Sequence, residues 1–441
     1  MRDAIRGIEP SDWDICTNAL PHETMSCFSD KQVIKTGLKH GTITLVLEGE
    51  NFEVTTYRID GEYTDSRHPD EVTFVSRLKD DLSRRDFTIN AMAYNPSEGI
   101  VDYYDGQGDI ERGFIRTVGN PDERFAEDAL RIMRALRFSS VFGYSIEGKT
   151  AASILRNKHL LEKVSRERIS NELSKLITGD NTEELLIKFA LVFTEIIPEI
   201  ESMIGFDQNN PWHHLDVWQH TAASVAAAPN DVYIRLTMLL HDIAKPRCYT
   251  EEDGIGHFYG HPSVSAGMAK DILIRLKYDN KTIDIVTQLI EYHDYEITPR
   301  KRVAKKLLSK ISEEQVRRLV EVKRADNMAQ EESKLEQRLS VLDEFLEIGE
   351  TIIKENECFT LKDLAVDGKD LMNAGVPEGR YVGQVLKQLL EMVINEEILN
   401  DKENCFWLYQ KYYTNFSHSP APLSSFRPLG FSTDGKFGKG D

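Results

Sequence analysis

The sequence contains few cysteines and no long apolar segment. Its five cysteines are scattered, odd in number and free of C-x-x-C spacing, which argues against structural disulfides and indicates a reducing compartment. No apolar run is long enough to cross a bilayer, and the first residues lack the basic-then-apolar pattern of a signal peptide. We therefore expect a cytoplasmic protein without membrane contact, whose oligomeric state the sequence leaves open.

The chain also lacks an excess of basic over acidic residues. The net charge is -19, so any contact with nucleic acid has to come from local groups of Lys and Arg, because these residues neutralise phosphate. Such groups occur at Arg131, Arg134 and Arg137, at Arg166 and Arg168, and as a basic stripe within residues 300–310. A charge run of this kind is most often a solvated face. At 441 residues with 40% hydrophobic content, the chain can form about three domains at roughly 150 residues each.

The most informative stretch is residues 125–138, which carries a carboxylate and several guanidinium groups at helical spacing. Asp128 and Arg131 are three residues apart, so in a continuous helix they are neighbours on its surface. Asp128 would accept the exocyclic amine of cytosine or adenine, and Arg131 would donate to the ring nitrogen. Guanine and uracil present the reverse pattern, and such a contact is worth roughly 1–3 kcal/mol of discrimination. The alternative is an ordinary salt-bridged helix face.

Carboxylates upstream support a phosphoryl-transfer site. Asp12 and Asp14 in D-W-D would share one face of a strand, because side chains alternate with period two. Two such acids can share divalent metal ions that hold the attacking and leaving oxygens. Glu53, in a predicted strand over residues 52–58, is the candidate third acid. A lone D-x-D, in contrast, is usually a solvated turn.

Residues 83–91 place two cations, an acid and an amide in a short polar-to-apolar transition. The cations, Arg84 and Arg85, suit a triphosphate, and Asp86 suits a ribose hydroxyl; Asn90 completes the group. Read alone, the segment fits a capped helix with charged flanks equally well.

Taken in order, these motifs resemble the bacterial CCA-adding tRNA nucleotidyltransferases of the polymerase β superfamily. The resemblance spans nearly the whole chain and includes the D-W-D acids, R-R-D-F-T-I-N-A, E-D-A-L-R, and E-R-I-S-N-E-L at residues 167–173. It implies an α+β nucleotidyltransferase head followed by an all-α neck, body and tail, which adds CTP-derived and then ATP-derived nucleotides to tRNA without a nucleic-acid template. Asp12 and Asp14 would bind Mg²⁺ with support from Glu53, and the residues that would bind the nucleotide are Arg2, Arg85, Asp86, Asn90, Asp128, Arg131, Arg134 and Arg137.

The chain differs from this family at its start. The family has a Gly-Gly pair just before V-R-D, whereas this chain begins Met1-Arg2-Asp3. We therefore expect a truncated head that lacks the first strand and the glycine turn, with Arg2 as the remnant of that nucleotide-binding turn. A polar, turn-rich insertion at residues 58–71 is retained, and the resemblance associates it with addition of the terminal A.

The middle of the chain carries a second group of candidate ligands. The segment Leu239–Lys245 contains the doublet His241-Asp242 and resembles the signature of HD-domain metal phosphohydrolases. Imidazole and carboxylate ligands suit Mn, Ni, Fe or Zn, and the residue types do not choose among them. The resemblance implies a main shell of His220, His241, Asp242 and Asp326, with His261 and His293 able to hold a second ion, and phosphatase or cyclic phosphodiesterase activity as in some relatives. Isolated histidines on apolar faces are, however, more often satisfied core residues.

These landmarks predict the domain organisation. We expect a head at residues 1–120, a helical neck and body for base recognition and RNA binding at 121–205, an HD unit at 206–330, a helical tail at 331–415, and disorder over 416–441. Two alternative functions remain open. A bacterial poly(A) polymerase shares the head and neck motifs, although the neutral-to-acidic tail disfavours it. In the second alternative, the chain is an HD phosphohydrolase or a tRNA-binding protein, and its transferase head is inactive.

Overall fold

The computed structural model describes residues 1–10, 13–61, 72–209, 215–330 and 334–413. The chain divides into two compact units, the first comprising residues 1–297 and 313–343 and the second comprising residues 298–312 and 344–441. In the described part of the chain, no helix combines the length and the apolar character that membrane spanning requires. The predicted class, an α+β head followed by a helical region, is confirmed by the order of elements.

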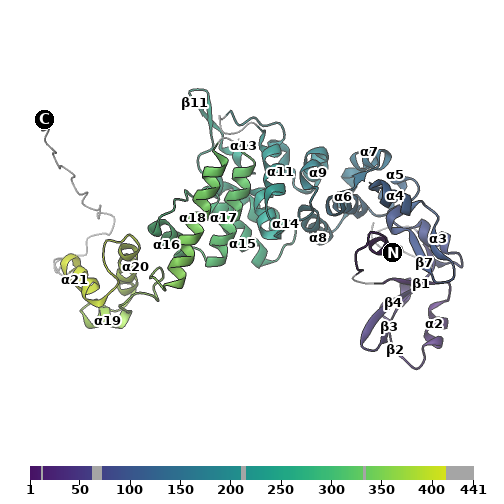
Figure 1. Cartoon of the computed structure of the whole chain (residues 1–441), viewed down its shortest axis with the longest axis horizontal. Helices are drawn as coiled ribbons and strands as arrows, with labels where there is room; N and C mark the ends of the chain where they lie inside the picture. Colours follow the sequence, from purple (N-terminus) through teal and green to yellow (C-terminus); the bar gives the residue numbers. More distant parts are fainter. Residues whose placement is uncertain (11–12, 62–71, 210–214, 331–333, 414–441) are drawn as a thin grey trace. The chain divides into compact units, whose positions relative to one another are not determined.

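A mixed four-stranded sheet forms the first part of the head. Its order is β1-β4-β3-β2, with β1 parallel to β4 and the other neighbours antiparallel. Apolar residues on one face, Ile43, Leu45 and Val54, pack against Met25 and Phe28, and α2 lies beside the strands (Figure 1). The elements are β1 (Ile15–Thr17), α2 (Pro21–Cys27), β2 (Gln32–Ile34), β3 (Thr42–Leu47) and β4 (Glu50–Thr56).

The rest of the head is built from hairpins and short helices. Gly106 begins α4, where an added Cβ would lie 2.3 Å from the carbonyl oxygen of Thr88, so this position requires glycine for α4 to approach the Thr88–Asn90 turn. The elements are α1 (Arg2–Ile5), β5 (Arg58–Asp60), β6 (Val72–Phe74), α3 (Leu78–Ser83), β7 (Met92–Asn95), β8 (Gly99–Asp102), α4 (Gly106–Arg112) and β9 (Phe114–Ile115).

The neck corrects one expectation from the sequence. Residues 125–138 are not one helix, because the chain is extended at Asp128 (φ -140°, ψ 102°) between α5 and α6. The cap of the first neck helix is Asn120, whose side chain accepts from the Asp122 N–H. The elements are α5 (Pro121–Glu127), α6 (Leu130–Phe142), β10 (Ser145–Ile146), α7 (Gly148–Asn157), α8 (Arg166–Ile177), α9 (Thr182–Lys188) and α10 (Ala190–Ile196).

The remaining helices of the first unit surround the predicted ligand residues. A β-hairpin connects α13 to α14. It consists of β11 (Thr250–Glu252) and β12 (Ile255–His257), and it projects beyond α13 (Figure 1). We had expected only helices here; the turn Asp253-Gly254, with φ of 54° and 77°, forms the hairpin instead. The helices are α11 (Val217–Ala227), α12 (Val232–Leu240), α13 (Lys245–Cys248), α14 (His261–Arg275), α15 (Asn280–Tyr292) and α17 (Glu313–Met328).

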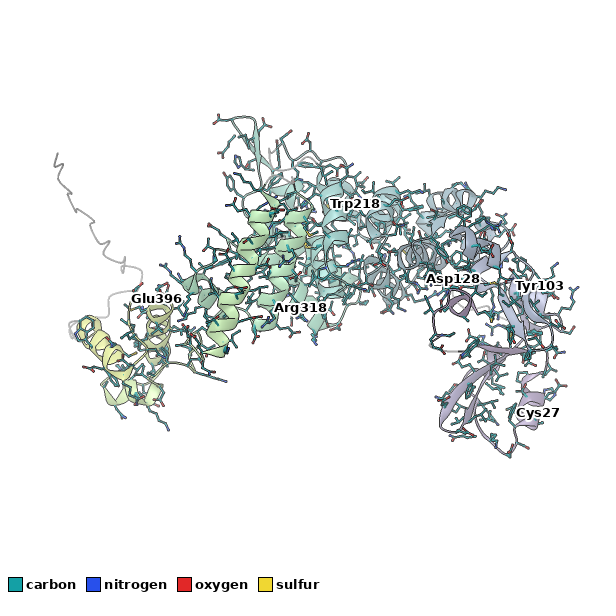
Figure 2. The ribbon with its side chains drawn as sticks, viewed as in Figure 1. Cys27, Tyr103, Asp128, Trp218, Arg318 and Glu396 are labelled. Carbon is teal, nitrogen blue, oxygen red and sulfur yellow. The ribbon has the colours of Figure 1, made fainter. Side chains whose placement is uncertain are left out.

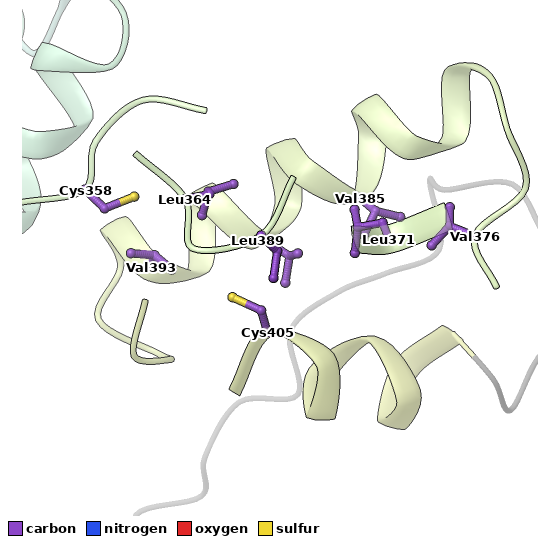
Figure 3. Close-up of a cluster of buried hydrophobic side chains, with 9 residues drawn as sticks. Cys358, Leu364, Leu371, Val376, Val385, Leu389, Val393 and Cys405 are labelled. Atoms are coloured by element: carbon purple, nitrogen blue, oxygen red, sulfur yellow. The ribbon is translucent and has the colours of Figure 1, made fainter. Parts of the chain in front are cut away.

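The second unit has its own apolar core. Side chains from α20 and from Cys405 of α21 are turned toward one another in Figure 3, and Leu371, Leu389 and Cys405 are almost fully buried. The basic stripe at 300–310 is partly neutralised, because Lys301 and Lys305 both pair with Glu357, at 2.5 and 2.7 Å. The helices are α16 (Lys301–Leu308), α19 (Gly368–Asn373), α20 (Arg380–Ile394) and α21 (Lys402–Tyr413), while α18 (Leu335–Lys354) contributes residues to both units. The predicted disorder at 416–441 lies outside the described residues.

Candidate active site and metal-binding cluster

The sheet brings two of the predicted acids together. In the parallel pairing of β1 with β4, Ile15 lies beside Val54, and the same register continued by one residue sets Asp14 beside Glu53. Val54 is buried, so Glu53 lies on the opposite, open face, where both carboxylates are exposed. Asp12 falls outside the described residues, as does most of the 58–71 insertion.

Arg85 and Asp14 both act electrostatically on one residue of β1, Cys16. Burial raises the pKa of the Cys16 thiol, the charge of Arg85 opposes that rise, and the charges of Asp81 and Asp14 add to it. One thiol on β1 is therefore within electrostatic range of Asp14, of the predicted triphosphate ligand Arg85 and of a third acid, Asp81. Sequence analysis did not select Asp81, because two adjacent acids in a first helical turn resemble a solvated surface.

Asp86 is at the centre of a buried polar network. Its Oδ2 accepts from Nε and Nη2 of Arg134 at 2.9 and 2.6 Å, and its Oδ1 accepts from Asn90 Nδ2 at 3.0 Å. Asn90 in turn accepts from Arg2 Nη1 at 2.8 Å. Burial by itself would raise the pKa of Asp86, but the Arg134 charge and the hydrogen bonds outweigh it and lower that pKa. Four predicted nucleotide-binding residues thus form one connected chain.

Asp128 and Arg131 have different partners, contrary to the side-by-side pair expected from helical spacing. Asp128 Oδ1 accepts from the Leu130 N–H at 3.0 Å, and its Oδ2 accepts from Arg168 Nη2 at 2.8 Å. Arg131 is 8% exposed and donates to Glu127 Oε2 at 2.7 Å and to the Arg84 carbonyl at 2.9 Å. Figure 2 labels Asp128 at the junction between the neck helices and the head.

Helix α8 supplies two charged partners to this region. Arg168 binds Asp128, and one turn later Glu172 lies 2.6 Å from Arg137 Nε and 3.9 Å from Arg134 Nη1. Because residues four apart share a helix face, one face of α8 complements the acid and the two arginines predicted to meet the nucleotide. The E-R-I-S-N-E-L motif was the available signal, but we assigned no role to its side chains.

The six predicted ligands of the middle segment converge into one cluster. Ligand atoms of one triad, His220, His241 and Asp326, lie within 4.8 Å of one another, and so do those of a second triad, Asp242, His261 and His293. Asp242 joins the two triads. Its Oδ2 is 3.1 Å from His241 Nε2, and its Oδ1 is 3.3 Å from His261 Nε2.

Main-chain carbonyls orient the imidazole rings. The Nδ1 atoms of His241, His261 and His293 lie 2.7, 2.9 and 2.7 Å from the carbonyl oxygens of Met238, Phe258 and Ile290. With Nδ1–H donating to these carbonyls, each Nε2 faces the cluster, which is the orientation that metal-binding histidines adopt. Sequence patterns identified the rings but not these supporting carbonyls.

The buried acids and histidines of the cluster shift one another's pKa values. The carboxylates of Asp242 and Asp326 raise the pKa of His241 to about 10 against the effect of burial, while burial and the charge of His241 lower that of His293 to about 3. Among the described residues, His241 Nε2 and both oxygens of Asp242 find no hydrogen bond of good geometry. Lys245, which the sequence analysis did not assign, lies 2.7 Å from Asp242 Oδ2 and donates to Gln208. The donor set therefore fits a divalent metal centre.

Known proteins resemble the chain along most of its length. A CCA-adding enzyme from Ligilactobacillus salivarius is 30% identical over 412 residues, which cover 91% of this chain and 88% of the relative. The chain belongs to the CCA-adding enzymes. It is accordingly a nucleotidyltransferase, and a CCA-adding enzyme from Limosilactobacillus reuteri is 32% identical over 403 residues, covering 91% of this chain and 88% of that relative.

Family and structure comparisons agree with this membership. Residues 1–116 match the poly A polymerase head domain, 143–204 the probable RNA- and SrmB-binding site of polymerase A, and 249–406 the putative domain 2 of tRNA nucleotidyltransferase. The Bacillus stearothermophilus CCA-adding enzyme in complex with CTP has a TM-score of 0.67 at 27% identity, covering 94% of this chain and 92% of that one. The fold also matches the Thermotoga maritima CCA-adding enzyme in complex with tRNA, with a TM-score of 0.56 at 19% identity and coverage of 93% and 89%.

Proposed function

We propose that this chain adds C, C and A to tRNA 3′ ends, using CTP and ATP and no nucleic-acid template. The observation that carries the proposal is the parallel register of β1 and β4, which pairs Ile15 with Val54 and, continued by one residue, would set Asp14 beside Glu53. Full-length similarity to enzymes of this name supports it.

Each predicted residue has a role in this reaction. Asp12, Asp14 and Glu53 offer the carboxylate oxygens that Mg²⁺ prefers, and a bound Mg²⁺ neutralises charge on the reacting phosphates. Arg85 binds the triphosphate, and Arg2 and Asn90 hold the segment that carries Asp86. Asp86 faces the ribose.

Base selection is assigned to Asp128 and Arg131. The two side chains come from the break before α6 and from its first turn, and they are held by different partners rather than paired to each other. Arg134 and Arg137 extend the positive charge along α6.

We further propose the division into head, neck, histidine–aspartate unit and tail at residues 1–120, 121–205, 206–330 and 331–415.

Incubation of the purified chain with Mg²⁺, labelled CTP or ATP, and tRNA lacking its terminal CCA tests this function. We expect two C additions followed by one A. Long A tracts would instead establish a poly(A) polymerase, and binding of tRNA without incorporation would leave an RNA-binding protein with an inactive head. Gel electrophoresis of the labelled tRNA products at single-nucleotide resolution distinguishes these outcomes.

A second activity is favoured by the cluster joined through Asp242. We propose an HD-type phosphohydrolase site that holds one or two ions of Mn, Ni, Fe or Zn, with His220, His241, Asp242 and Asp326 as the main shell. The inward-facing Nε2 atoms, held by carbonyls on their far sides, support this assignment. A bound metal supplies an activated water for attack on a phosphate ester, while Lys245 keeps Asp242 ionised and oriented.

Metal analysis and hydrolysis of phosphate esters test the second site. The metal content of protein purified without chelator should be one or two ions per chain, and phosphate release should depend on that metal. An active hydrolase that does not extend tRNA would support the alternative in which this unit is the only working enzyme.

A further inference from the structure

A buried acid lies between the sheet and the arginines of the head. Asp81, in the first turn of α3, has a relative exposure of 1%. Its neighbour Asp80 points outward and pairs with the exposed Arg77 at 2.8 Å. Adjacent residues of the same type on one helix therefore occupy opposite environments, which makes Asp80 a natural control for Asp81.

One carboxylate oxygen of Asp81 links two elements of the head. Its Oδ1 accepts from the main-chain N–H of Arg58 at 3.2 Å and from Arg84 Nε at 3.0 Å. Arg58 begins β5 just after β4, the strand that carries Glu53. Asp81 thus joins the continuation of the acid-bearing strand to the R-R-D segment.

The second oxygen faces Arg85 without a hydrogen bond. Asp81 Oδ2 lies 3.7 Å from Arg85 Nη2, and across the described residues neither this oxygen nor the buried Arg85 Nε has a hydrogen-bond partner. Buried polar atoms are nearly always satisfied, so this pair is unusual. Charge attraction holds the guanidinium in place although its Nε makes no hydrogen bond. A guanidinium fork of this kind suits a phosphate group.

Asp81 and Arg85 both lie within electrostatic range of β1, the strand that follows Asp14. Arg85, Asp81 and Asp14 all act on the Cys16 thiol of β1, which is mostly buried. The Asp81–Arg85 pair and Asp14 therefore all act on the same strand of the head sheet.

We propose that Asp81 is a positioning residue of the transferase site, whose carboxylate holds the Arg85 guanidinium in the orientation in which its donors bind the triphosphate. Asp81 acts through Arg85 and does not itself touch the nucleotide. This inference rests on the proposed function of the head, in which Arg85 binds the triphosphate.

The test is a double-mutant cycle between Asp81→Asn and Arg85→Ala, with Asp80→Asn as the matched control. Asn keeps an acceptor for the Arg58 N–H but removes the charge that holds Arg85. We expect Asp81→Asn to raise KM for CTP and ATP about tenfold, the scale of one charge-assisted hydrogen bond. The KM for tRNA and the melting temperature should match those of Asp80→Asn and of the wild type.

In the Arg85→Ala background, Asp81→Asn should change the nucleotide KM less than about twofold, because contacting residues that act through one another are not additive. An equal rise in both backgrounds would overturn the proposal, as would equal changes in KM for tRNA, kcat and melting temperature. If Asp81→Asn does not fold, Asp81→Ser enters the same cycle. A wild-type chain that incorporates no nucleotide contradicts the function of the head, whereas an active chain with an additive cycle contradicts only the role of Asp81.

Discussion

Arg168 donates to Asp128 across the gap between α8 and the break before α6, with 2.8 Å between Nη2 and Oδ2. The other oxygen of Asp128 accepts from the Leu130 N–H, so the carboxylate is held from two sides. The orientation of the proposed base-selecting acid is therefore set by α8 and by the start of α6. Arg131, three residues later, is held separately by Glu127 and the Arg84 carbonyl.

Replacing Arg168 by Met should relax base choice. Asp128 would lose the partner that orients Oδ2, and one well-made base contact is worth roughly 1–3 kcal/mol, so we expect at least a roughly tenfold loss of discrimination between CTP and UTP. Single-nucleotide incorporation measures the ratio of kcat/KM values. Arg156→Met is the control, because Arg156 of α7 forms an exposed ion pair with Asp122 of α5, away from Asp128. Unchanged discrimination in Arg168→Met would show that α8 does not orient the selecting acid.

Asp14→Asn should reduce incorporation of both nucleotides to the background without enzyme. The amide keeps the size of the side chain but loses the charge that a divalent cation requires. Hydrolysis at the histidine–aspartate cluster should be unaffected, since the two sites use separate residues. Asp30→Asn, an exposed head acid paired with Lys31, serves as the control. A parallel loss of hydrolysis would contradict independent sites.

Asp242→Asn should abolish metal binding at the cluster, because Asp242 contributes an oxygen to each triad. Elemental analysis gives the ion content per chain, and chelator should lower the melting temperature of the wild type but not of this variant. A ligand at 100 times its Kd stabilises by about 2.7 kcal/mol. His257→Ala, on the hairpin outside the cluster, is the control. Wild-type ion content in Asp242→Asn would exclude the bridging role.

Glu357→Gln should destabilise the second unit in a pH-dependent manner. Burial would raise the pKa of Glu357, but hydrogen bonds from Lys301 and Lys305 outweigh it and lower the pKa from 4.5 to about 2. A depressed folded-state pKa stabilises above the unfolded value and loses that effect as the pH falls. The difference in melting temperature between wild type and variant should therefore be constant near neutral pH and shrink between pH 4.5 and 2. A difference that does not vary over this range would mean that the carboxylate charge is not what stabilises the unit.

Local patterns predicted several of the residues that the structure brings together. The D-W-D spacing and the β-branched strand over 52–58 placed Asp14 and Glu53 together, because strand periodicity and parallel pairing are short-range rules. The spacing of His241-Asp242, His261 and His293 likewise identified the cluster. Helical spacing failed at Asp128, because the Asp side chain bonds the Leu130 N–H and so stabilises a break that residue counting cannot detect.

Asp81 illustrates what local patterns leave undecided. Asp80 and Asp81 are the same residue type in the same turn, yet one is at the surface and the other has 1% exposure. Burial depends on which elements pack over a helix face, and here that is β5, whose Arg58 is 23 residues from Asp81 in the sequence.

The amino-acid order alone predicted the kinds of chemistry that we propose: carboxylates for metal-assisted phosphoryl transfer, arginines for phosphate, and imidazoles for a second metal centre. Tertiary packing decided which of these groups meet, as in the pairing of Asp128 with Arg168 rather than with its neighbour Arg131. The physical reason is range. Periodicity and capping act over a few residues, whereas the partner of a buried charge is chosen by desolvation, which only the assembled fold imposes.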